Sequence, residues 1–513
     1  MAAAAVTTTD QSRHRSVSKV GIIGAGISGI AAAKHLSSHH PVVFEATDSI
    51  GGVWKHCAYR TTRLQTPRRD FEFSDYPWPS QTTESDEFPT YLEILDYLHG
   101  YATHFDVLKF VKFNSKVVQL RYIGGPEAED STAAAGVYGS LLNGRPAWEV
   151  AVQDTHLNTI QWYEFELVVI CVGRYGDIPN IPTFPHNKGQ EVFKGKVLHS
   201  LDYAKLDHDD ARALLQNKRV VIVGYRKSAI DLAVECAEAN QGPEGKACTM
   251  LIRSLHWTVP SYRIWGLPFF LFYSTRFSQF LQETPNQGLL KSIFCSLFSP
   301  MIRKVFSKFI ESYLTWKMPL EKYGLKPEHS FEEDYASCQM AIMPNTFFEE
   351  ADKGKIVFKK TTKWWFWSGG VVFDEQDNNN TTTKLEADVV IFNTGFQGKL
   401  KLQSLLPHPF NTLLVDSSDI VPLYRGVIHP LIPNMAFVGY LESVSNLRTG
   451  ELRCKWLAKL ADDGFKLPSI HQMLQQISDE IQVMKNTTRF YKRQCVSTFS
   501  ISYTDEISQD IYG

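Results

Sequence analysis

Residues 20–54 read VGIIGAGISGIAAAKHLSSHHPVVFEATDSIGGVW, and this stretch decides the fold. Its start, Val20–Ile23, is a short apolar run that is typical of a buried parallel strand. A turn with G-x-G-x-x-G spacing follows at once, and residues 30–36 favour a helix. The first glycine permits the tight turn, the second lets a pyrophosphate approach the backbone, and the third lets the helix pack on the strand. The six turn positions are Gly24, Ala25, Gly26, Ile27, Ser28 and Gly29.

An acidic residue completes this fingerprint. Val42–Phe44 predicts a second strand that ends in Glu45, which follows Gly24 by 21 residues. A carboxylate at this spacing accepts hydrogen bonds from ribose hydroxyls, while the N–H groups at the helix start face the phosphates. The combination predicts a dinucleotide site; the alternative is a glycine-rich turn in an α/β core without a ligand.

Length and composition set limits on the rest. A chain of 513 residues is too long for one compact core, so two or more domains are expected. The net charge of −2 argues against a nucleic-acid partner. Residues 1–18 lack the apolar core of a secretory signal, so we expect a flexible tail on a cytoplasmic protein. The absence of an apolar run of about 18 residues predicts no transmembrane helix.

The eight cysteines show neither C-x-x-C nor metal-ligand spacing. We therefore expect most of them to be reduced core residues, and we expect no metal site.

Further glycines mark backbone beside the predicted ligand. Gly51 and Gly52 precede Trp54, which suggests backbone held close to a flat ligand; a loop anchored by a core tryptophan is the alternative. A strand over residues 162–172 ends at Gly173, where ligands bind in open α/β sheets. A later strand within residues 385–396 ends in Thr394 and Gly395 and repeats this arrangement.

A second strand–turn–helix unit begins at Arg219. Arg226 takes the place of the second glycine, which leaves phosphates less room but adds a favourable charge. The next strand, residues 249–252, ends in Arg253 instead of an acid, and an arginine there favours NADPH through its 2′-phosphate. An α/β unit without a ligand is the alternative. The turn holds Gly224, Tyr225, Arg226, Lys227, Ser228 and Ala229.

Two nucleotide units in one chain favour FAD at the first and NADPH at the second, because a nicotinamide must reach an acceptor. The segment between them, residues 174–205, carries the pattern F-x-G-x-x-x-H-x-x-x-Y from Phe193 to Tyr203. His199 in this pattern is expected to be a hydrogen-bonded linker residue more than a catalyst.

Residues 262–345 do not fit a plain nucleotide-binding unit. Apolar pairs recur every four residues with basic residues between them, which predicts two amphipathic helices broken near Pro300. We expect this helical insertion, and residues 265–316 in particular, to cover a substrate channel. Peripheral contact with a membrane surface is the alternative.

The predicted fold class is α/β, with two Rossmann-like dinucleotide-binding domains of the two-dinucleotide flavoprotein type and a helical insertion. Residues 19–200 and 350–513 are expected to form the FAD domain, and residues 201–349 the NADPH domain with its insertion. A helix over residues 446–460 is expected to point its N-terminus at the flavin ring.

These blocks together resemble the class B flavin-containing monooxygenases over residues 18–500. A plant branch that N-hydroxylates pipecolic acid in systemic immunity and defence is most similar, through blocks such as YLEILDYL and SFEEDYASCQMAI. The resemblance implies that NADPH-reduced FAD activates O2. It rests on GAGISG (24–29), GGVW (51–54), SDYP (74–77), FKGKVLHSLDY (193–203), GYRKSA (224–229) and FNTGF (392–396).

Gln65 is the residue that the resemblance assigns to catalysis. It precedes SDYP by nine residues, where most members carry an asparagine near the flavin reaction centre. A longer amide still donates a hydrogen bond. The implied substrate is a small amine, first of all pipecolic acid, with Arg425 or Arg448 as the expected partner of its carboxylate.

Three alternatives to this function stay open. Within the enzyme class they are S-oxygenation of thioethers and auxin-forming oxidation of indole-3-pyruvate. Outside it is a redox-sensing flavoprotein, which only Arg226 favours. The sequence leaves the oligomeric state undecided.

Overall fold

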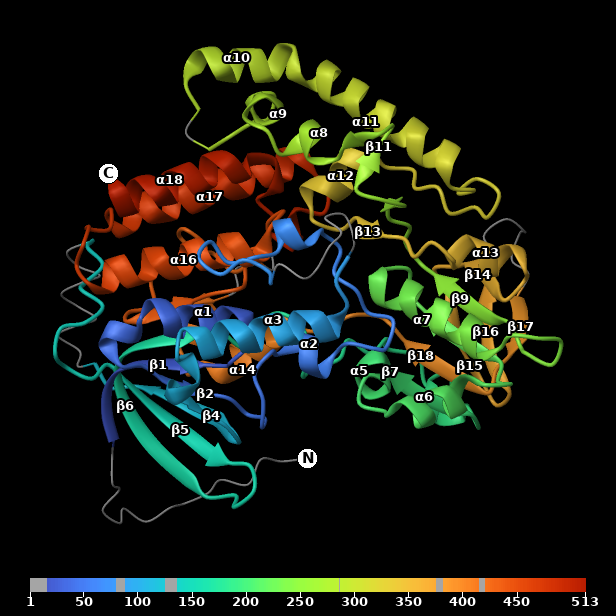
Figure 1. Cartoon of the computed structure of the whole chain (residues 1–513), viewed down its shortest axis with the longest axis horizontal. Coiled ribbons are helices and arrows are strands. Elements are labelled where there is room, and N and C mark those ends of the chain that lie inside the picture. The colour runs from blue at the N-terminus through green and yellow to red at the C-terminus, as the bar shows by residue number, and fades with distance from the viewer. Residues whose placement is uncertain (1–15, 80–87, 125–135, 286, 375–381, 415–419) are drawn as a thin grey trace.

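The computed structural model describes residues 16–79, 88–124, 136–285, 287–374, 382–414 and 420–513. Two α/β units lie side by side, and a layer of helices runs along one edge of the molecule (Figure 1). Most of the expected N-terminal tail lies outside the described residues, but Ser16 already belongs to the first strand. The sequence also predicts loops over residues 123–146 and 376–383, and parts of both lie outside the described residues.

The first unit is built on a seven-stranded sheet with the order β3-β2-β1-β6-β5-β4, in which β19 also pairs with β6. The strands β1, β2, β3, β6 and β19 are parallel, and β4 and β5 extend the sheet antiparallel. The strands are β1 (Ser16–Ile23), β2 (Val42–Phe44), β3 (Val111–Lys112), β4 (Ser115–Tyr122), β5 (Trp148–Asp154), β6 (Ile160–Ile170) and β19 (Met435–Phe437).

Helices cover this sheet because their apolar faces match its buried strands. Helix α1 packs against α16, and α16 in turn packs against α18. The helix α3 starts at a capping box between Thr90 and Glu93, which satisfies two orphan N–H groups. The helices are α1 (Ile27–His35), α2 (Val53–His56), α3 (Tyr91–His104), α14 (Gly398–Leu405), α15 (Phe410–Leu413), α16 (Asn446–Ala461), α17 (Ile470–Thr487) and α18 (Ser500–Tyr512).

The second unit holds a five-stranded, fully parallel sheet with the order β14-β9-β8-β18-β7. A three-stranded antiparallel sheet, β15-β16-β17, is inserted between β14 and β18. The elements are β7 (Lys196–His199), β8 (Val220–Val223), β9 (Cys248–Ile252), β14 (Ile356–Lys360), β15 (Trp364–Trp367), β16 (Gly370–Asp374), β17 (Thr382–Glu386), β18 (Val389–Phe392), α5 (Ser200–Tyr203), α6 (His208–Leu215), α7 (Lys227–Ala239) and α13 (Phe347–Asp352).

The pairing corrects the expected domain boundaries. Residues 356–360 and 389–392 were expected with the first unit, but they pair with β9 and β8 of the second sheet. Residues 196–199, expected at the end of the first stretch, form the edge strand β7 beside β18. A fully buried run such as Val389–Phe392 suits a central strand of either sheet, so its sequence does not select one. We propose that the chain returns to the first unit after residue 395.

The insertion forms a helical layer beside both units (Figure 1). The expected break near Pro300 is confirmed, because α10 ends at Leu297 and α11 begins at Ser299. Among the described residues, no helix combines the length and apolar character that a membrane-spanning segment needs. The elements are β10 (Thr258–Val259), β11 (Arg263–Ile264), β12 (Leu267–Pro268), α8 (Phe270–Tyr273), α9 (Arg276–Phe280), α10 (Leu289–Leu297), α11 (Ser299–Lys317), α12 (Phe331–Ala336) and β13 (Ala341–Ile342).

Candidate functional site

One large cavity joins the two glycine-rich turns. It measures about 3000 Å³, and residues from both α/β units and from the insertion line it. Among the predicted cofactor-binding residues, three do not reach its wall: Ala25, Gly29 and Ala229. The predicted residues on the wall are Gly24, Gly26, Ile27, Ser28, Glu45, Gly52, Trp54, Gln65, Gly173, Gly224, Tyr225, Arg226, Lys227, Ser228, Arg253, Thr394 and Gly395.

The first turn requires glycine at two positions and leaves an opening at a third. Gly24 has a φ of +99°, and a Cβ there would lie 2.8 Å from the carbonyl oxygen of Cys171. A Cβ at Gly29 would lie only 1.8 Å from the carbonyl oxygen of Gly24, because α1 packs directly on the turn. At Gly26 the nearest atom would be 3.7 Å away, on Gly52. The turn is therefore open where a pyrophosphate is expected to pass.

Glu45 is held beside this turn. The side chain is buried, and its Oε2 accepts a hydrogen bond from the Ala25 N–H at 2.8 Å. Its Oε1 accepts from the N–H and the hydroxyl of Thr47, at 3.0 and 2.8 Å. A carboxylate oxygen has two acceptor sites, so Oε2 keeps one for a ligand hydroxyl. Ala25 thus acts through its backbone and fixes the acid.

The loop after Glu45 closes against the same turn. A Cβ at Gly52, which has a φ of +55°, would lie 3.2 Å from the Cα of Gly26. Trp54 is half-buried, and its ring meets that of Phe71 edge-on with centroids 6.2 Å apart. Trp54 therefore anchors the loop and also reaches the cavity wall. Its position is consistent with both a structural anchor and a residue beside a flat ligand.

Two strands of the first sheet end in glycines at the cavity. Gly173 follows β6 with a φ of +73°, and Gly439 follows β19 with a φ of +95°. A Cβ at Gly439 would lie 2.7 Å from the Oγ of Ser28, which places this residue against the first turn. Helix α16 begins at Asn446, and its first residues also line the cavity. Gly439 has the same sequence signal as Gly173, because each glycine ends an apolar run.

The second turn differs from the first in its side chains. Gly224 has a φ of +137°, and a Cβ there would lie 2.7 Å from the carbonyl oxygen of Asn393. Tyr225 and Ala229 are buried in the core of the second unit, so Tyr225 reaches the cavity only marginally. Arg226 donates a hydrogen bond from Nη2 to the Oε1 of Gln339, which lies at the base of the insertion.

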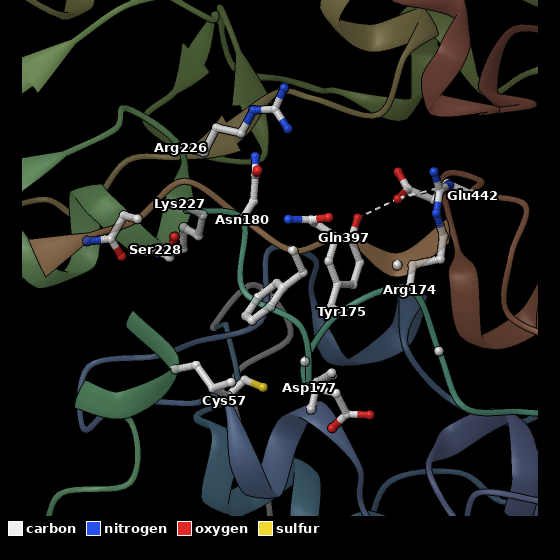
Figure 2. A pocket seen from close by; sticks show the side chains of 18 of the residues that line it. Cys57, Arg174, Tyr175, Asp177, Asn180, Arg226, Lys227, Ser228, Gln397 and Glu442 are labelled. Atoms are coloured by element: carbon white, nitrogen blue, oxygen red, sulfur yellow. Dashed lines mark hydrogen bonds and ion pairs between the residues drawn. The ribbon is translucent and has the colours of Figure 1, made fainter. Parts of the chain in front are cut away.

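The neighbouring charges lie on the same side of the cavity. Lys227 donates from Nζ to the Oδ1 of Asp231 at 2.5 Å. Burial raises the pKa of the Asp231 carboxyl to about 6, although Lys227 opposes that shift. Arg253 is exposed at the end of β9 and lines the cavity, where we expected it. Figure 2 shows Arg226, Lys227 and Ser228 around this part of the cavity.

Two chain segments cross between the units side by side. The Asn180 N–H donates to the carbonyl oxygen of Gly395 at 2.8 Å, and the hydroxyl of Thr394 donates to the carbonyl oxygen of Asn180. The Nε2 of His199 lies 3.0 Å from the same Gly395 oxygen, and its Nδ1 accepts from the Leu201 N–H at 3.1 Å. Burial lowers the pKa of His199. His199 is therefore a linker residue, as predicted, and Thr394 and Gly395 belong to the junction.

Gln65 lies where the insertion meets the first unit. Its Oε1 accepts a hydrogen bond from the N–H of Ile342 in β13 at 3.1 Å. This contact orients the amide, and its Nε2 has no hydrogen-bond partner within the described part of the chain. Gln65 thus offers a donor N–H group at the cavity wall.

An ionic network that the sequence did not reveal lies beside the junction. Tyr175 donates a hydrogen bond to Glu442 (Figure 2). The Nη2 of Arg493 lies 3.1 Å from both oxygens of that carboxylate. The Nη1 of Arg174 donates to the Arg493 carbonyl oxygen at 2.8 Å and lies 3.5 Å from Glu442. Arg174 and Tyr175 directly follow Gly173, which is the signal that would have found them.

The expected carboxylate partners do not lie in the cavity. Arg425 is buried and pairs with Glu506 and Asp510 of α18. Arg448 donates to Glu72 at 2.7 Å and to the Arg69 carbonyl oxygen. Neither side chain lines the cavity, so this expectation is wrong. Both arginines stabilise packing between elements of the first unit, which the sequence alone does not distinguish from a binding role.

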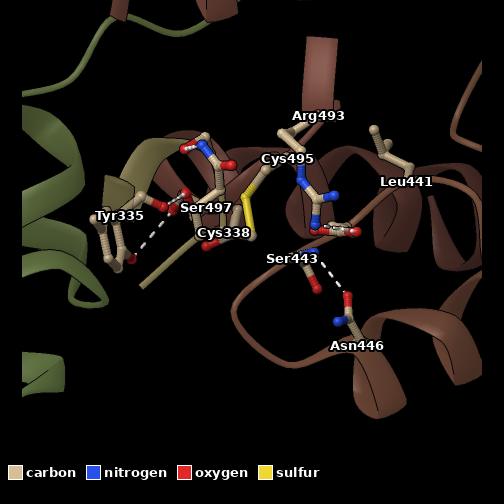
Figure 3. Close-up of a disulfide and its surroundings, with 12 residues drawn as sticks. Tyr335, Cys338, Leu441, Ser443, Asn446, Arg493, Cys495 and Ser497 are labelled. Atoms are coloured by element: carbon tan, nitrogen blue, oxygen red, sulfur yellow. Dashed lines mark hydrogen bonds and ion pairs between the residues drawn. A yellow bond between two sulfur atoms is a disulfide. The ribbon is translucent and has the colours of Figure 1, made fainter. Parts of the chain in front are cut away.

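A disulfide joins Cys338 to Cys495, which are 157 residues apart in the sequence (Figure 3). This corrects the expectation that the cysteines are reduced, for these two residues; distant pairing leaves no spacing signal. The free cysteines are mostly buried, as expected, and burial raises the pKa of the half-buried Cys57 thiol to about 11. Cys338 lines the cavity next to Gln339, so the disulfide fixes this wall to the C-terminal segment.

Comparisons with known proteins agree with this geometry. The model of the flavin-binding monooxygenase-like family matches residues 17–513. Probable flavin-containing monooxygenase 1 of Arabidopsis thaliana is 59% identical over 96% of this chain and 92% of its own length.

Two solved structures share the fold at low identity. The structure of OTEMO in complex with FAD and NADP is 17% identical, with a TM-score of 0.65 and 98% of each chain covered. The structure of the S-allyl-L-cysteine S-oxygenase from Allium sativum is 20% identical, with a TM-score of 0.57 and 96% and 88% of the two chains covered.

Proposed function

The chain belongs to the flavin-binding monooxygenase-like family, and from this premise we propose that it transfers one oxygen atom of O2 to the nitrogen of pipecolic acid or a similar small amine. It is a flavin-dependent monooxygenase of the FAD- and NADPH-using kind. The observation that carries the proposal is that both glycine-rich turns and Gln65 line one cavity.

We propose that FAD lies at the first turn and NADPH at the second. The opening at Gly26 and the remaining acceptor site on Glu45 fit a pyrophosphate and a ribose. Arg253, with Arg226 and Lys227 as helpers, fits the 2′-phosphate of NADPH. Bound FAD, once NADPH has reduced it, supplies the activated oxygen.

The protein itself needs no nucleophile, because the substrate nitrogen is the nucleophile. Gln65 presents its Nε2–H group at the cavity wall, where it would donate a hydrogen bond to a bound nicotinamide or to the reacting oxygen. Tyr262 and Phe269 of the insertion line the same cavity and exclude water from it. The roles left to this chain are therefore orientation, hydrogen bonding and exclusion of water.

Only a free amine has the lone pair that the reaction uses. Alkylammonium groups have pKa values of about 10, so a small fraction of the substrate is free at pH 7. We therefore expect turnover to rise with pH above 7. A turnover rate that stays constant between pH 7 and 9 would show that the chemical step does not limit the reaction.

We propose that Arg226, besides helping to bind NADPH, takes the place of Arg425 and Arg448 as the partner of the substrate carboxylate. Arg174 and Arg493 share Glu442, whereas Arg226 is hydrogen-bonded to the neutral amide of Gln339. Arg226→Ala should raise the KM for pipecolate about tenfold or more and leave that for piperidine, which lacks the carboxylate, nearly unchanged. If the KM values for both amines change equally, Arg226 contributes to NADPH binding alone.

The decisive experiment is mass spectrometry on the products of the purified, flavin-loaded protein. The proposal expects an NADPH- and O2-dependent gain of one oxygen on pipecolate, and fragmentation should place it on nitrogen. Thioethers and indole-3-pyruvate in the same panel test the S-oxygenase and auxin-forming alternatives. If pipecolate stays unchanged while a thioether is oxidised efficiently, the S-oxygenase takes its place.

We also propose a cytoplasmic location, peripheral to the endoplasmic reticulum. The support for the peripheral contact is the insertion, in which apolar residues alternate with basic ones. Cell fractionation of the tagged full chain tests this location.

A further inference from the structure

A buried carboxylate at the base of the insertion holds two histidines. Asp334 of α12 is fully buried, and its Oδ1 lies 2.8 Å from the Nδ1 of His256. Its Oδ2 lies 2.8 Å from the Nε2 of His329 and accepts a hydrogen bond from the Trp257 N–H at 2.6 Å. Three hydrogen bonds thus satisfy the carboxylate without a bound cation.

The carboxylate fixes which nitrogen of His256 carries a proton. Burial alone would raise the pKa of the Asp334 carboxyl, but the hydrogen bonds from His256 and His329 outweigh burial and lower that pKa. An ionised carboxylate only accepts hydrogen bonds, so the Nδ1 of His256 holds the proton. In the neutral imidazole the other nitrogen, Nε2, is then a free acceptor.

This acceptor nitrogen faces the cavity. His256 lines the cavity, whereas Asp334 and His329 do not. Within the described part of the chain, the Nε2 of His256 has no hydrogen-bond partner, and it is not an enclosed atom. The ring of Phe490 packs against both imidazoles, with centroids 5.3 Å from His256 and 5.1 Å from His329, and shields the cluster on another side.

Strand pairing places His256 near Gln65. His256 lies two residues before β10, in which Val259 pairs with Ile342 of β13. Ile342 is the residue whose N–H group orients Gln65. A strand advances about 3.3 Å per residue, so the backbone of His256 lies roughly 10 Å from this point.

The same turn of the insertion connects His256 to Arg226. Asp334 holds His256, and its carbonyl oxygen accepts a hydrogen bond from the Gln339 N–H at 2.9 Å. The side chain of Gln339 in turn accepts a hydrogen bond from Arg226. Residues 334–339 therefore fix a cation and a hydrogen-bond acceptor on one wall of the cavity.

From these contacts we propose that His256 is the catalytic base that removes a proton from the substrate ammonium group. The inference rests on the proposed function, because an amine must lose its ammonium proton before its nitrogen can accept oxygen. With the substrate carboxylate at Arg226, the ammonium N–H donates to the Nε2 of His256. The N–H bond breaks, its electron pair stays on the substrate nitrogen, and the proton forms the Nε2–H bond of an imidazolium. Solvent takes this proton after the product leaves.

Two effects favour this transfer inside the protein. In water an alkylammonium group has a pKa of about 10 and an imidazolium about 6.5, so the transfer is unfavourable there. Removal of water destabilises the ammonium ion in the cavity, and the paired carboxylate of Asp334 stabilises the imidazolium.

Charged groups on the neighbouring elements do not oppose it by direct contact. Glu333 of α12 pairs with Arg489, just after α17, at 2.7 Å. Arg226 donates to a neutral amide, and Arg253 is exposed. Within the described residues, the charge in direct contact with His256 is therefore the carboxylate that it shares with the second histidine.

The pH dependence of kcat tests the base. Proton transfer within the complex leaves the number of bound protons unchanged, so it adds a route that does not depend on pH. Without the base only the free amine reacts, and its fraction rises about tenfold per pH unit below its pKa. His256→Gln should therefore lower kcat for pipecolate about tenfold or more at pH 7, with little change in KM, and should approach the unmodified protein toward pH 9. The unmodified protein should show the shallower slope of log kcat against pH.

A less basic substrate gives an independent test. The ring oxygen of morpholine-3-carboxylate makes its nitrogen less basic than that of pipecolate and leaves the carboxylate in place. A base matters less for such an amine, so His256→Gln should lower its kcat much less. An equal loss with both amino acids overturns the proposal, because a damaged wall does not distinguish substrates by basicity.

His329→Gln is the matched control variant. His329 bonds to the same carboxylate at the same 2.8 Å, but it does not line the cavity. It should lower the Tm as His256→Gln does and keep the pH slope of the unmodified protein. If both variants show the same steep slope, the cluster only supports the fold and the proposal is wrong. Flavin absorbance and circular dichroism report folding, and His256→Asn replaces His256→Gln if the latter loses flavin.

The remaining outcomes separate this inference from the proposed function. If the unmodified protein leaves pipecolate unchanged, the proposed function fails and this inference fails with it. If the unmodified protein hydroxylates pipecolate and His256→Gln keeps its rate and slope, only the inference fails. The ligand-type atoms of His256, His329 and Asp334 lie within 4.8 Å of one another. A stoichiometric transition metal that both histidine variants lose would therefore make the cluster a metal site and also overturn the proposal.

Discussion

Gln65 shows how one hydrogen bond defines a role for a side chain. Because the Ile342 N–H occupies its Oε1, the free donor is the Nε2 group. Gln65→Ala removes this donor, so we expect more NADPH to be oxidised without product, and hydrogen peroxide release to rise severalfold. Peroxide and product per NADPH are the measurement, with flavin content as the folding check.

Gln65→Asn is the conservative control, because it keeps the amide and shortens its reach by one methylene group. We expect its coupling to lie between those of the unmodified protein and Gln65→Ala. Unchanged peroxide release in Gln65→Ala would show that the residue only packs the wall.

Arg253 is the residue on which the cofactor preference rests. A charge-assisted hydrogen bond to a phosphate contributes roughly 1.5–3 kcal/mol, so Arg253→Ala should raise the KM for NADPH about tenfold or more. NADH lacks the 2′-phosphate, and its KM should change less than twofold. Steady-state kinetics with both nucleotides measure this, and equal effects would remove the assignment.

We expect the free energy of unfolding to depend on pH through the Glu480 carboxyl. It is buried in α17, and burial raises its pKa to about 8, although Arg425 and Arg453 oppose the shift. The folded state therefore keeps a proton that the unfolded chain releases near pH 4.3. Stability from this group is fully present below about pH 4.3 and is lost progressively as pH rises toward 8.

Glu480→Gln should remove this loss, so its Tm should exceed that of the unmodified protein at pH 8 and match it at pH 5. Thermal melts across this range are the measurement. Asp479→Asn changes the same charge at a less buried neighbour and serves as control. A Tm difference that does not vary with pH would contradict the assignment.

At the scale of the element, the glycines of the first strand–turn–helix unit have two different roles: one is required for packing, and another leaves room for a ligand. An alanine at Gly29 would collide with the Gly24 carbonyl, so Gly29→Ala should damage the fold. An alanine at Gly26 meets its nearest atom at 3.7 Å, so Gly26→Ala should fold but lose flavin. Absorbance near 450 nm and circular dichroism together measure this, and a yellow Gly26→Ala protein would argue against flavin at this turn.

At the scale of the whole molecule, the Cys338–Cys495 disulfide joins the cavity wall to the C-terminal segment. Closing so long a loop stabilises a protein by about 2–4 kcal/mol. We expect Cys495→Ser to lower the Tm by several degrees and to increase peroxide release, because residues 339–342 hold both Arg226 and Gln65. Dithiothreitol should reproduce the effect in the unmodified protein and add nothing in the variant; an additional effect there would point to another cause.

The sequence by itself determined both nucleotide units, because their turns are local. The spacing of Gly24, Gly26 and Gly29 indicates a strand, a turn and a helix that are in contact within a few residues, and the structure contains all three. The break near Pro300 and the hydrogen-bonded linker role of His199 followed from equally local signals.

Only the tertiary structure decided which distant segments meet. Three features depend on contacts between residues far apart in the chain. They are the pairing of β18 with β8, the disulfide between Cys338 and Cys495, and the salt bridges that hold Arg425 and Arg448 away from the cavity. An apolar strand, a cysteine or an arginine has the same local sequence signature whichever partner it finds. The contact of Gln65 with Ile342, 277 residues further along, arises in the same way, because packing of the insertion on the first unit brings them together.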